Sequence, residues 1–167
     1  MTALAKILLP ANLQKFLNLI TYCEGTDKQG TPYSELFGYD NFTDFSKHPN
    51  IKVTKNGYTS TAAGRYQILY RTYLSLGGGS FRPVDQDNMA IALIKRRGAY
   101  QNVLKGEFET AIKKCATEWA SLPGSPYGQP TVKLSTAMAF LNKPVTGNTL
   151  PFTAIALGAA ILLYKIV

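Results

Sequence analysis

The strongest constraint on the fold is a change of pattern along the chain. Apolar residues recur at helical spacing from Leu13 to Glu24. Between residues 25 and 62, glycines and prolines separate short aromatic or β-branched runs, which predicts a small, irregular antiparallel sheet. From residue 67 to residue 140 the patterns are again helical. We therefore predict an α+β domain over residues 1–141, with a ligand cleft between the sheet and the helical part.

Glu24 is the most informative single residue, because it closes the first helical stripe and Gly25 follows at once. The apolar face that buries this helix therefore also carries a carboxyl group. Poor hydration disfavours the charged form of such a group, so it keeps its proton near neutral pH. We predict that Glu24 acts as a general acid.

Composition limits the possible partners. The 167 residues include 18 basic and 10 acidic side chains, for a net charge of +8. This excess indicates either a solvated basic surface or attraction to a polyanion such as nucleic acid, anionic lipid or the anionic cell envelope. No nucleic-acid-binding motif accompanies it, so we expect no specific nucleic-acid partner.

The sequence contains no motif typical of a metal site or a cofactor site. The two cysteines, Cys23 and Cys115, have no metal spacing, and His48 is the one histidine. We therefore predict no metal site and no cofactor. Both cysteines occupy apolar helical positions, which favours two buried free thiols, with a single disulfide as the alternative. His48 precedes Pro49 in a polar loop and is expected to be structural or solvent-facing.

The C-terminal end of the sequence differs from the rest. Residues 142–149 contain a proline and a glycine and are interpreted as a linker. Residues 150–167 are apolar except for Lys165, and a spanning helix needs about 20 apolar residues. We predict a transmembrane helix here, with a buried core helix as the alternative. The N-terminal apolar stretch is short and ends at Pro10, so we expect no signal peptide.

Four ordered blocks of sequence resemble one known family. They are Cys23–Asp27, Phe42–Pro49, Ser60–Ile68 and Trp119–Gln129. Together they are similar to the family of phage lambda lysozyme, over about residues 12–130. The segment from Gln29 to Asn41 matches poorly, and the apolar tail lies outside the resemblance.

This resemblance implies a lysozyme-like α+β fold and a lytic transglycosylase. Such an enzyme cleaves the β-1,4 bond between N-acetylmuramic acid and N-acetylglucosamine in peptidoglycan and leaves a 1,6-anhydromuramoyl end. The family's single catalytic acid falls on Glu24. The substrate-binding positions that the resemblance implies are Gly64, Arg65, Tyr66, Gln67, Tyr127 and Gln129.

On the residues alone, several of these roles have equally ordinary alternatives. Tyr127 either faces a sugar or packs within its loop, and Gln67 either binds an N-acetyl group or lies at a strand-end surface. Arg65 either lines the cleft or only braces the turn. Trp119 lies on an apolar helical face and is expected in the core.

The number of carboxylates separates two mechanisms. A hydrolysing glycosidase normally uses two, roughly 5–10 Å apart. At the two spacings known from other lysozymes the chain has Tyr33 and Asn41, so a well-placed second acid is missing, although Asp40 and Asp44 remain alternatives. One carboxylate suffices when the C6 hydroxyl of the muramoyl sugar itself attacks, because ring closure is intramolecular.

We therefore expect a phage peptidoglycan lytic transglycosylase anchored by its C-terminal helix. Its expected locations are a virion-internal membrane, for cell-wall penetration during genome delivery, or the host inner membrane, for lysis. Expected partners are glycan strands, the membrane and other virion proteins. The alternatives are a lysozyme-type hydrolase with a second carboxylate, and a catalytically silent virion or peptidoglycan-binding protein.

Overall fold

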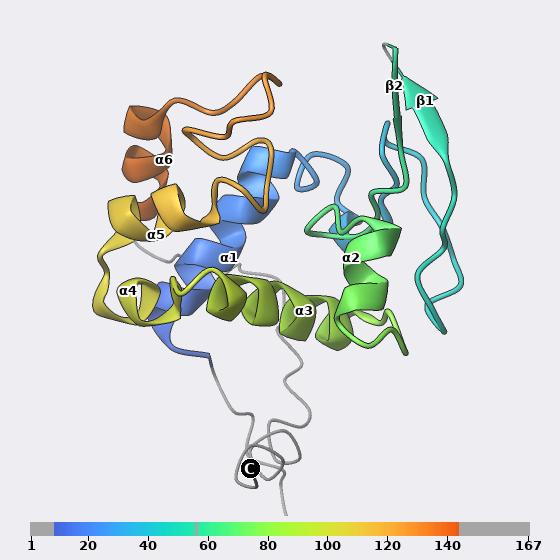
Figure 1. The fold of residues 1–167 in the computed structure, drawn as a ribbon, viewed down its shortest axis with the longest axis horizontal. Coiled ribbons are helices and arrows are strands. Elements are labelled where there is room, and N and C mark those ends of the chain that lie inside the picture. The colour runs from blue at the N-terminus through green and yellow to red at the C-terminus, as the bar shows by residue number, and fades with distance from the viewer. Residues whose placement is uncertain (1–8, 56, 144–167) are drawn as a thin grey trace, which may run out of the picture.

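The computed structural model describes residues 9–55 and 57–143. Its elements, in chain order, are α1 (Ala11–Glu24), the 3-10 helix η1 (Pro32–Ser34), β1 (Val53–Lys55), β2 (Tyr58–Ser60), α2 (Tyr70–Ser75), α3 (Pro83–Arg96), α4 (Tyr100–Lys105), α5 (Phe108–Cys115) and α6 (Leu134–Leu141). Helices and a small sheet occupy separate parts of the domain (Figure 1). The predicted α+β class is therefore confirmed.

The first helix forms because its apolar residues share one face. Leu13, Phe16, Leu17 and Ile20 are all at most 1% exposed, and Leu19 is equally buried. This face packs among α3, α4, α5 and α6, which surround α1 (Figure 1). Burial of such side chains contributes about 1.5–3 kcal/mol each. Because α1 is anchored in the core, the position of its last residue, Glu24, is fixed relative to the surrounding helices.

The sheet is as small and irregular as the sequence predicts. β1 and β2 form one antiparallel hairpin, with Val53 opposite Ser60 and Lys55 opposite Tyr58. Beside the hairpin the chain makes isolated antiparallel bridges, such as Leu36 with Ala63 and Ala63 with Ile68. Glycines and prolines interrupt every longer run, so few ladder hydrogen bonds can follow one another.

One predicted feature of this region changes in the structure. The helix that we expected from Gln67 begins at Tyr70, because Gln67 has a φ of 46° and Ile68 is bridged to Ala63. For His48 the structure shows the structural alternative and not the solvent-facing one, since the residue is buried at 1% exposure. Its Nε2 lies 2.8 Å from the carbonyl oxygen of Ile68, and its Nδ1 accepts the backbone N–H of Asn50.

Two other expectations are confirmed. Trp119 is buried at 3% exposure, and its indole N–H donates to the carbonyl of Tyr66 at 3.0 Å. Cys23 and Cys115 are both free thiols, although only Cys115 is buried as expected and Cys23 is partly buried.

The fold prediction was wrong in one part, the transmembrane helix. None of the helices within residues 9–55 and 57–143 has the length and apolar character needed to cross a bilayer. The expected helix, residues 150–167, lies outside the described residues, as does the linker from residue 144 onward. A run of 18 residues with Pro151 at its second position is at the lower limit for spanning, so apolarity alone was a weak basis. The fold of the described residues is therefore the α+β domain.

Candidate active site

Glu24 is the last residue of α1, and the helix stops there for a local reason. Gly25 has a φ of 74°, a left-handed conformation that residues with a Cβ rarely adopt. The N–H groups of Gly25 and Thr26 then donate to the carbonyls of Tyr22 and Thr21, each at 3.2 Å. The carboxyl group therefore lies at the negative end of the helix dipole, which favours its protonated form.

The Glu24 carboxyl group is held by a residue far along the chain. The hydroxyl of Ser121 donates to its Oε1 at 2.5 Å. Glu24 is partly buried. This burial raises the pKa of Glu24 to about 7, and the hydrogen bond from Ser121 acts in the opposite direction. An acid with this pKa is suited to proton transfer near neutral pH.

The turn at Gly64 requires a glycine. Gly64 has a φ of 74°, and a Cβ there would lie 2.1 Å from Oε1 of Gln86. Gln86 cannot easily withdraw, because it is fully buried and accepts the backbone N–H of Arg65 at 2.9 Å. Its amide nitrogen also donates to the carbonyls of Tyr33 and Phe81, each at 2.8 Å. Gly64 therefore serves close packing and offers no side chain to a ligand.

Arg65 lies inside the protein rather than at its surface. Its residue exposure is 6%, and its guanidinium group donates to Thr21 Oγ1 at 2.9 Å and to Asn18 Oδ1 at 2.6 Å. It also donates to the hydroxyl of Tyr33 at 2.8 Å and pairs with Asp87 at 3.4 Å. Since Thr21 and Asn18 belong to α1 and Asp87 to α3, Arg65 fixes the turn against both helices.

Tyr66 belongs to the same buried network. It is 0% exposed, and its hydroxyl donates to Asp87 at 2.5 Å. The hydroxyl of Tyr33 donates to the same carboxylate at 3.0 Å. Arg65, Tyr66, Tyr33 and Asp87 are called the Asp87 network below. The polar groups of Arg65 and Tyr66 are buried and hydrogen-bonded within the protein. Their geometry therefore suits bracing of the turn better than contact with a sugar.

The other three predicted binding residues are more accessible. Gln67 is partly buried, and its amide nitrogen donates to the carbonyls of Gly64 at 3.1 Å and Glu35 at 3.3 Å. Tyr127 is 56% exposed, with its hydroxyl bonded to the carbonyl of Thr117 at 2.8 Å. Gln129 is exposed. These three residues remain accessible enough to meet a ligand.

The two alternative second acids do not resemble Glu24. Asp40 and Asp44 are both exposed. Asp44 accepts the backbone N–H of Ser46 at 2.8 Å, and hydrogen bonding to Ser46 lowers its pKa. A carboxyl group whose pKa is lowered, as that of Asp44 is, has no special readiness to exchange a proton near pH 7.

Sequence reasoning missed two polar residues of this region, Ser121 and Glu35. Ser121 lies within the fourth block of the resemblance, but an uncharged serine in a loop gives no sequence signal of a functional role. Glu35 lies in the poorly matching segment, so the resemblance gave no signal. It is 2% exposed, and its Oε2 has no hydrogen-bond partner in the described part of the chain. Burial, together with the nearby charge of Asp27, raises the pKa of Glu35 to about 7.

Replacing Glu35 by glutamine is expected to make folding stability less dependent on pH. The folded chain holds this proton more tightly than the unfolded chain, so the contribution of Glu35 to stability is complete in acid and is lost as the pH rises through about 7. The variant lacks this contribution but keeps that of Glu24, whose pKa is also raised to about 7, and the difference between variant and wild type reaches at most about 3 kcal/mol. Urea unfolding at acid, neutral and alkaline pH measures it. Asp40→Asn, at an exposed position, is the matched control, and parallel curves for Glu35→Gln and wild type would contradict the prediction.

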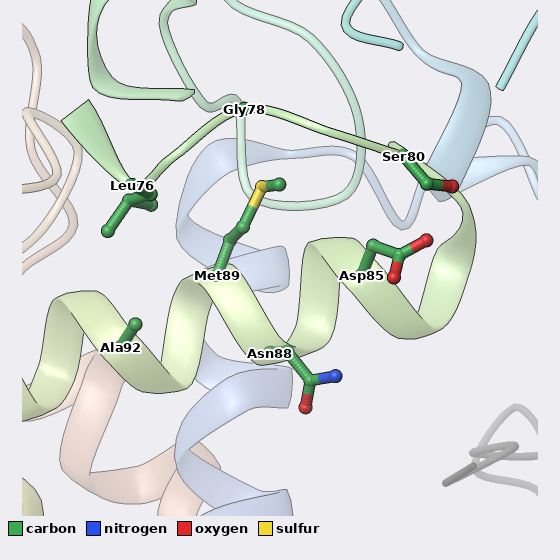
Figure 2. Close-up of a pocket in the computed structure, with 7 residues that line it drawn as sticks. All are labelled: Leu76, Gly78, Ser80, Asp85, Asn88, Met89 and Ala92. Atoms are coloured by element: carbon green, nitrogen blue, oxygen red, sulfur yellow. The ribbon is translucent and has the colours of Figure 1, made fainter. Parts of the chain in front are cut away.

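A hollow elsewhere on the surface is not this site. A space of about 250 Å³ lies between α3 and the segment that precedes it. Figure 2 shows the residues that line it, which are Leu76, Gly78, Ser80, Asp85, Asn88, Met89 and Ala92. Its one carboxylate, Asp85, is paired with Arg82 at 3.0 Å. None of the predicted site residues lines it. In the described part of the chain, no group of three or more His, Cys, Asp or Glu side chains could hold a metal ion.

The end of α1 therefore combines a near-neutral acid with a position between the helices and the small sheet (Figure 1). This arrangement defines the class of lysozyme-like enzymes that cleave glycosidic bonds.

Comparisons with known proteins identify the family. The Endolysin family model matches residues 14–146. The endolysin of Escherichia phage lambda is 43% identical over 124 residues, which cover 68% of this chain and 78% of that protein. The endolysin of Escherichia phage P2 is 40% identical over 141 residues, covering 71% and 83%. The chain belongs to the endolysin family.

Solved structures agree with this assignment. A structure of bacteriophage lambda lysozyme complexed with a chitohexasaccharide has a TM-score of 0.72 and 37% identity, covering 81% of this chain and 95% of that one. A second lambda lysozyme structure has a TM-score of 0.67 and 36% identity, with coverage of 81% and 93%. The lysozyme-like fold is confirmed, and the protein is a phage enzyme that degrades peptidoglycan in host lysis.

The predicted location was wrong. We expected a membrane-associated enzyme in the virion or the host inner membrane. The relatives that match are endolysins, and none of the described helices is able to cross a membrane. The error came from giving the apolar tail more weight than the domain. The expected partners, a membrane and other virion proteins, therefore lack support. The alternative of a catalytically silent virion or peptidoglycan-binding protein also lacks support.

Proposed function

We propose that this endolysin is a lytic transglycosylase that cleaves peptidoglycan glycan strands with Glu24 as its single acid and base. The observation that carries this proposal is the state of Glu24. Its pKa is raised to about 7 by burial, and Ser121 bonds its carboxyl group. Asp40 and Asp44, by contrast, are exposed to solvent.

The reaction needs one proton to travel in a cycle. Protonated Glu24 gives its proton to the glycosidic oxygen as the bond from that oxygen to C1 of the muramoyl sugar breaks. The resulting carboxylate removes the proton from the C6 hydroxyl of the same sugar, and O6 bonds to C1. The product is a 1,6-anhydromuramoyl end, and Glu24 is again protonated. Because nucleophile and electrophile belong to one sugar, no positioned water is required.

The substrate class follows from the family and from one relative. The lambda lysozyme structure contains a chitohexasaccharide, a chain of β-1,4-linked sugars. By analogy, we assign glycan contact in this chain to Gln67, Tyr127 and Gln129, the accessible members of the predicted set. Arg65 and Tyr66 are assigned to bracing of the turn that presents Gln67.

Product analysis tests the transglycosylase proposal. Purified sacculi are digested with the protein, and the released fragments are analysed by mass spectrometry before and after borohydride reduction. Anhydromuramoyl ends do not react with borohydride and are lighter by one water than hydrolysed ends. We expect such ends to predominate. Reducing ends in their place would refute transglycosylation.

One observation favours a hydrolase as the second candidate. Glu35 is a buried carboxyl group whose pKa is also raised to about 7, which suits an acid or base that handles water. In that case the digest contains reducing ends, and Glu35→Gln abolishes their release. Under the transglycosylase proposal, Glu35→Gln retains anhydro products.

A further inference from the structure

We propose that Ser121 is a positioning residue for Glu24, and that it fixes the carboxyl group through the loop that it closes. This inference rests on the proposed role of Glu24 and extends it to a residue on another part of the chain. The distance from Ser121 Oγ to Glu24 Oε1 is 2.5 Å, short enough for a strong bond to a charged acceptor.

Ser121 is itself held from several directions. Its carbonyl accepts the backbone N–H of Val132 at 3.0 Å, which joins the two ends of the intervening loop. Two residues earlier, the buried Trp119 donates to the carbonyl of Tyr66. Within the loop, the hydroxyl of Tyr127 donates to the carbonyl of Thr117. The hydroxyl of Ser121 is thus presented to Glu24 by an anchored segment.

This bond affects the two states of Glu24 unequally. A hydroxyl donor stabilises the carboxylate more than the neutral acid, because a hydrogen bond to a charged acceptor is the stronger one. Ser121 therefore limits how far burial raises the proton affinity of Glu24, and it fixes the orientation of Oε1.

Other titratable groups lie near Glu24, but they act differently. Burial raises the pKa of the Cys23 thiol to about 12, so this neighbour stays neutral at working pH. Asp27 and Lys28 are both exposed in the following loop, where solvent screens their charges. On α6, the residue that stacks against Tyr22 of α1 is the uncharged Phe140. Ser121 is therefore the neighbour whose removal should change the titration of Glu24 most.

The test compares Ser121→Ala with Ser121→Thr and Ser125→Ala. Ser125 lies in the same loop, and its buried hydroxyl has no hydrogen-bond partner in the described part of the chain, which makes it a matched control. Carbon-13 NMR titration follows the carboxyl carbon of Glu24, assigned with Glu24→Gln. We expect Ser121→Ala to raise the Glu24 titration midpoint by about 0.5–1.5 pH units. Ser121→Thr, which keeps the hydroxyl, should stay near wild type, and Ser125→Ala should not shift.

Activity profiles on sacculi provide the second readout. Activity depends on protonated Glu24, so its alkaline limb should move upward with the NMR midpoint in Ser121→Ala and in neither other variant. An unchanged NMR midpoint in Ser121→Ala, or an equal shift in Ser125→Ala, would overturn the proposal. An NMR shift without any movement of the alkaline limb would instead reject Glu24 as the acid. The two failures are therefore distinguishable.

Discussion

Glu24→Gln is expected to lower the rate of peptidoglycan cleavage by about 10³-fold or more. Glutamine is close to glutamate in size but cannot give a proton to the glycosidic oxygen or remove one from the C6 hydroxyl. General acid–base catalysis typically contributes about 10²–10⁴-fold, and in the proposed mechanism one residue serves both steps. Release of soluble fragments from purified sacculi measures the rate.

The control for this prediction is an exposed glutamate. Glu109 lies on α5, where its side chain is 53% exposed and paired with Lys113. Glu109→Gln should retain wild-type activity. Both variants should melt within a few degrees of wild type at neutral pH, because Glu24→Gln removes a carboxyl group that burial already disfavours. A Glu24→Gln protein with more than a tenth of wild-type activity would remove Glu24 from the mechanism.

Asp87→Ala is expected to lower the free energy of unfolding by about 3–5 kcal/mol. The carboxylate is 2% exposed, and it accepts the hydroxyls of Tyr33 and Tyr66 and pairs with Arg65. Its removal leaves a buried guanidinium group without its counter-charge, and it leaves the buried hydroxyl of Tyr66 and the partly buried hydroxyl of Tyr33 without their acceptor. Denaturant unfolding, monitored by circular dichroism, measures the loss.

Asp85, two residues earlier on α3, provides the matched comparison for Asp87. It is partly buried and pairs with Arg82, whose side chain is 66% exposed. Because such surface pairs contribute little, Asp85→Ala should cost less than about 1 kcal/mol. Equal losses for the two alanine variants would show that the Asp87 network does not stabilise the fold beyond an ordinary surface pair.

The sequence was sufficient to predict α1 and the residue that ends it. Apolar residues at a spacing of three and four dictate a buried helical face, and Gly25 supplies the left-handed residue that stops the helix. The position of Glu24 follows from these local rules alone. The small sheet was equally predictable, since glycine and proline act on their immediate neighbours.

What the sequence could not predict depends on contacts between distant segments. For Arg65 the sequence left two roles open, lining the cleft or bracing the turn, because the choice depends on Asp87 and on acceptors in α1 that pair with its buried guanidinium group. Gln67 was expected to begin a helix, but the bridge between Ala63 and Ile68 holds the chain extended beyond it. Glu35 has no periodic pattern that would predict a buried carboxyl group.

The bond between Glu24 and Ser121 joins residues 97 positions apart. A growing chain therefore contains Glu24, the proposed proton donor, long before it contains Ser121, the proposed orienting partner. Fragments that end before residue 121 contain the acid but lack the hydroxyl that fixes it. The orientation of the Glu24 carboxyl group is thus completed late in synthesis, when the segment that carries Ser121 has docked against the end of α1.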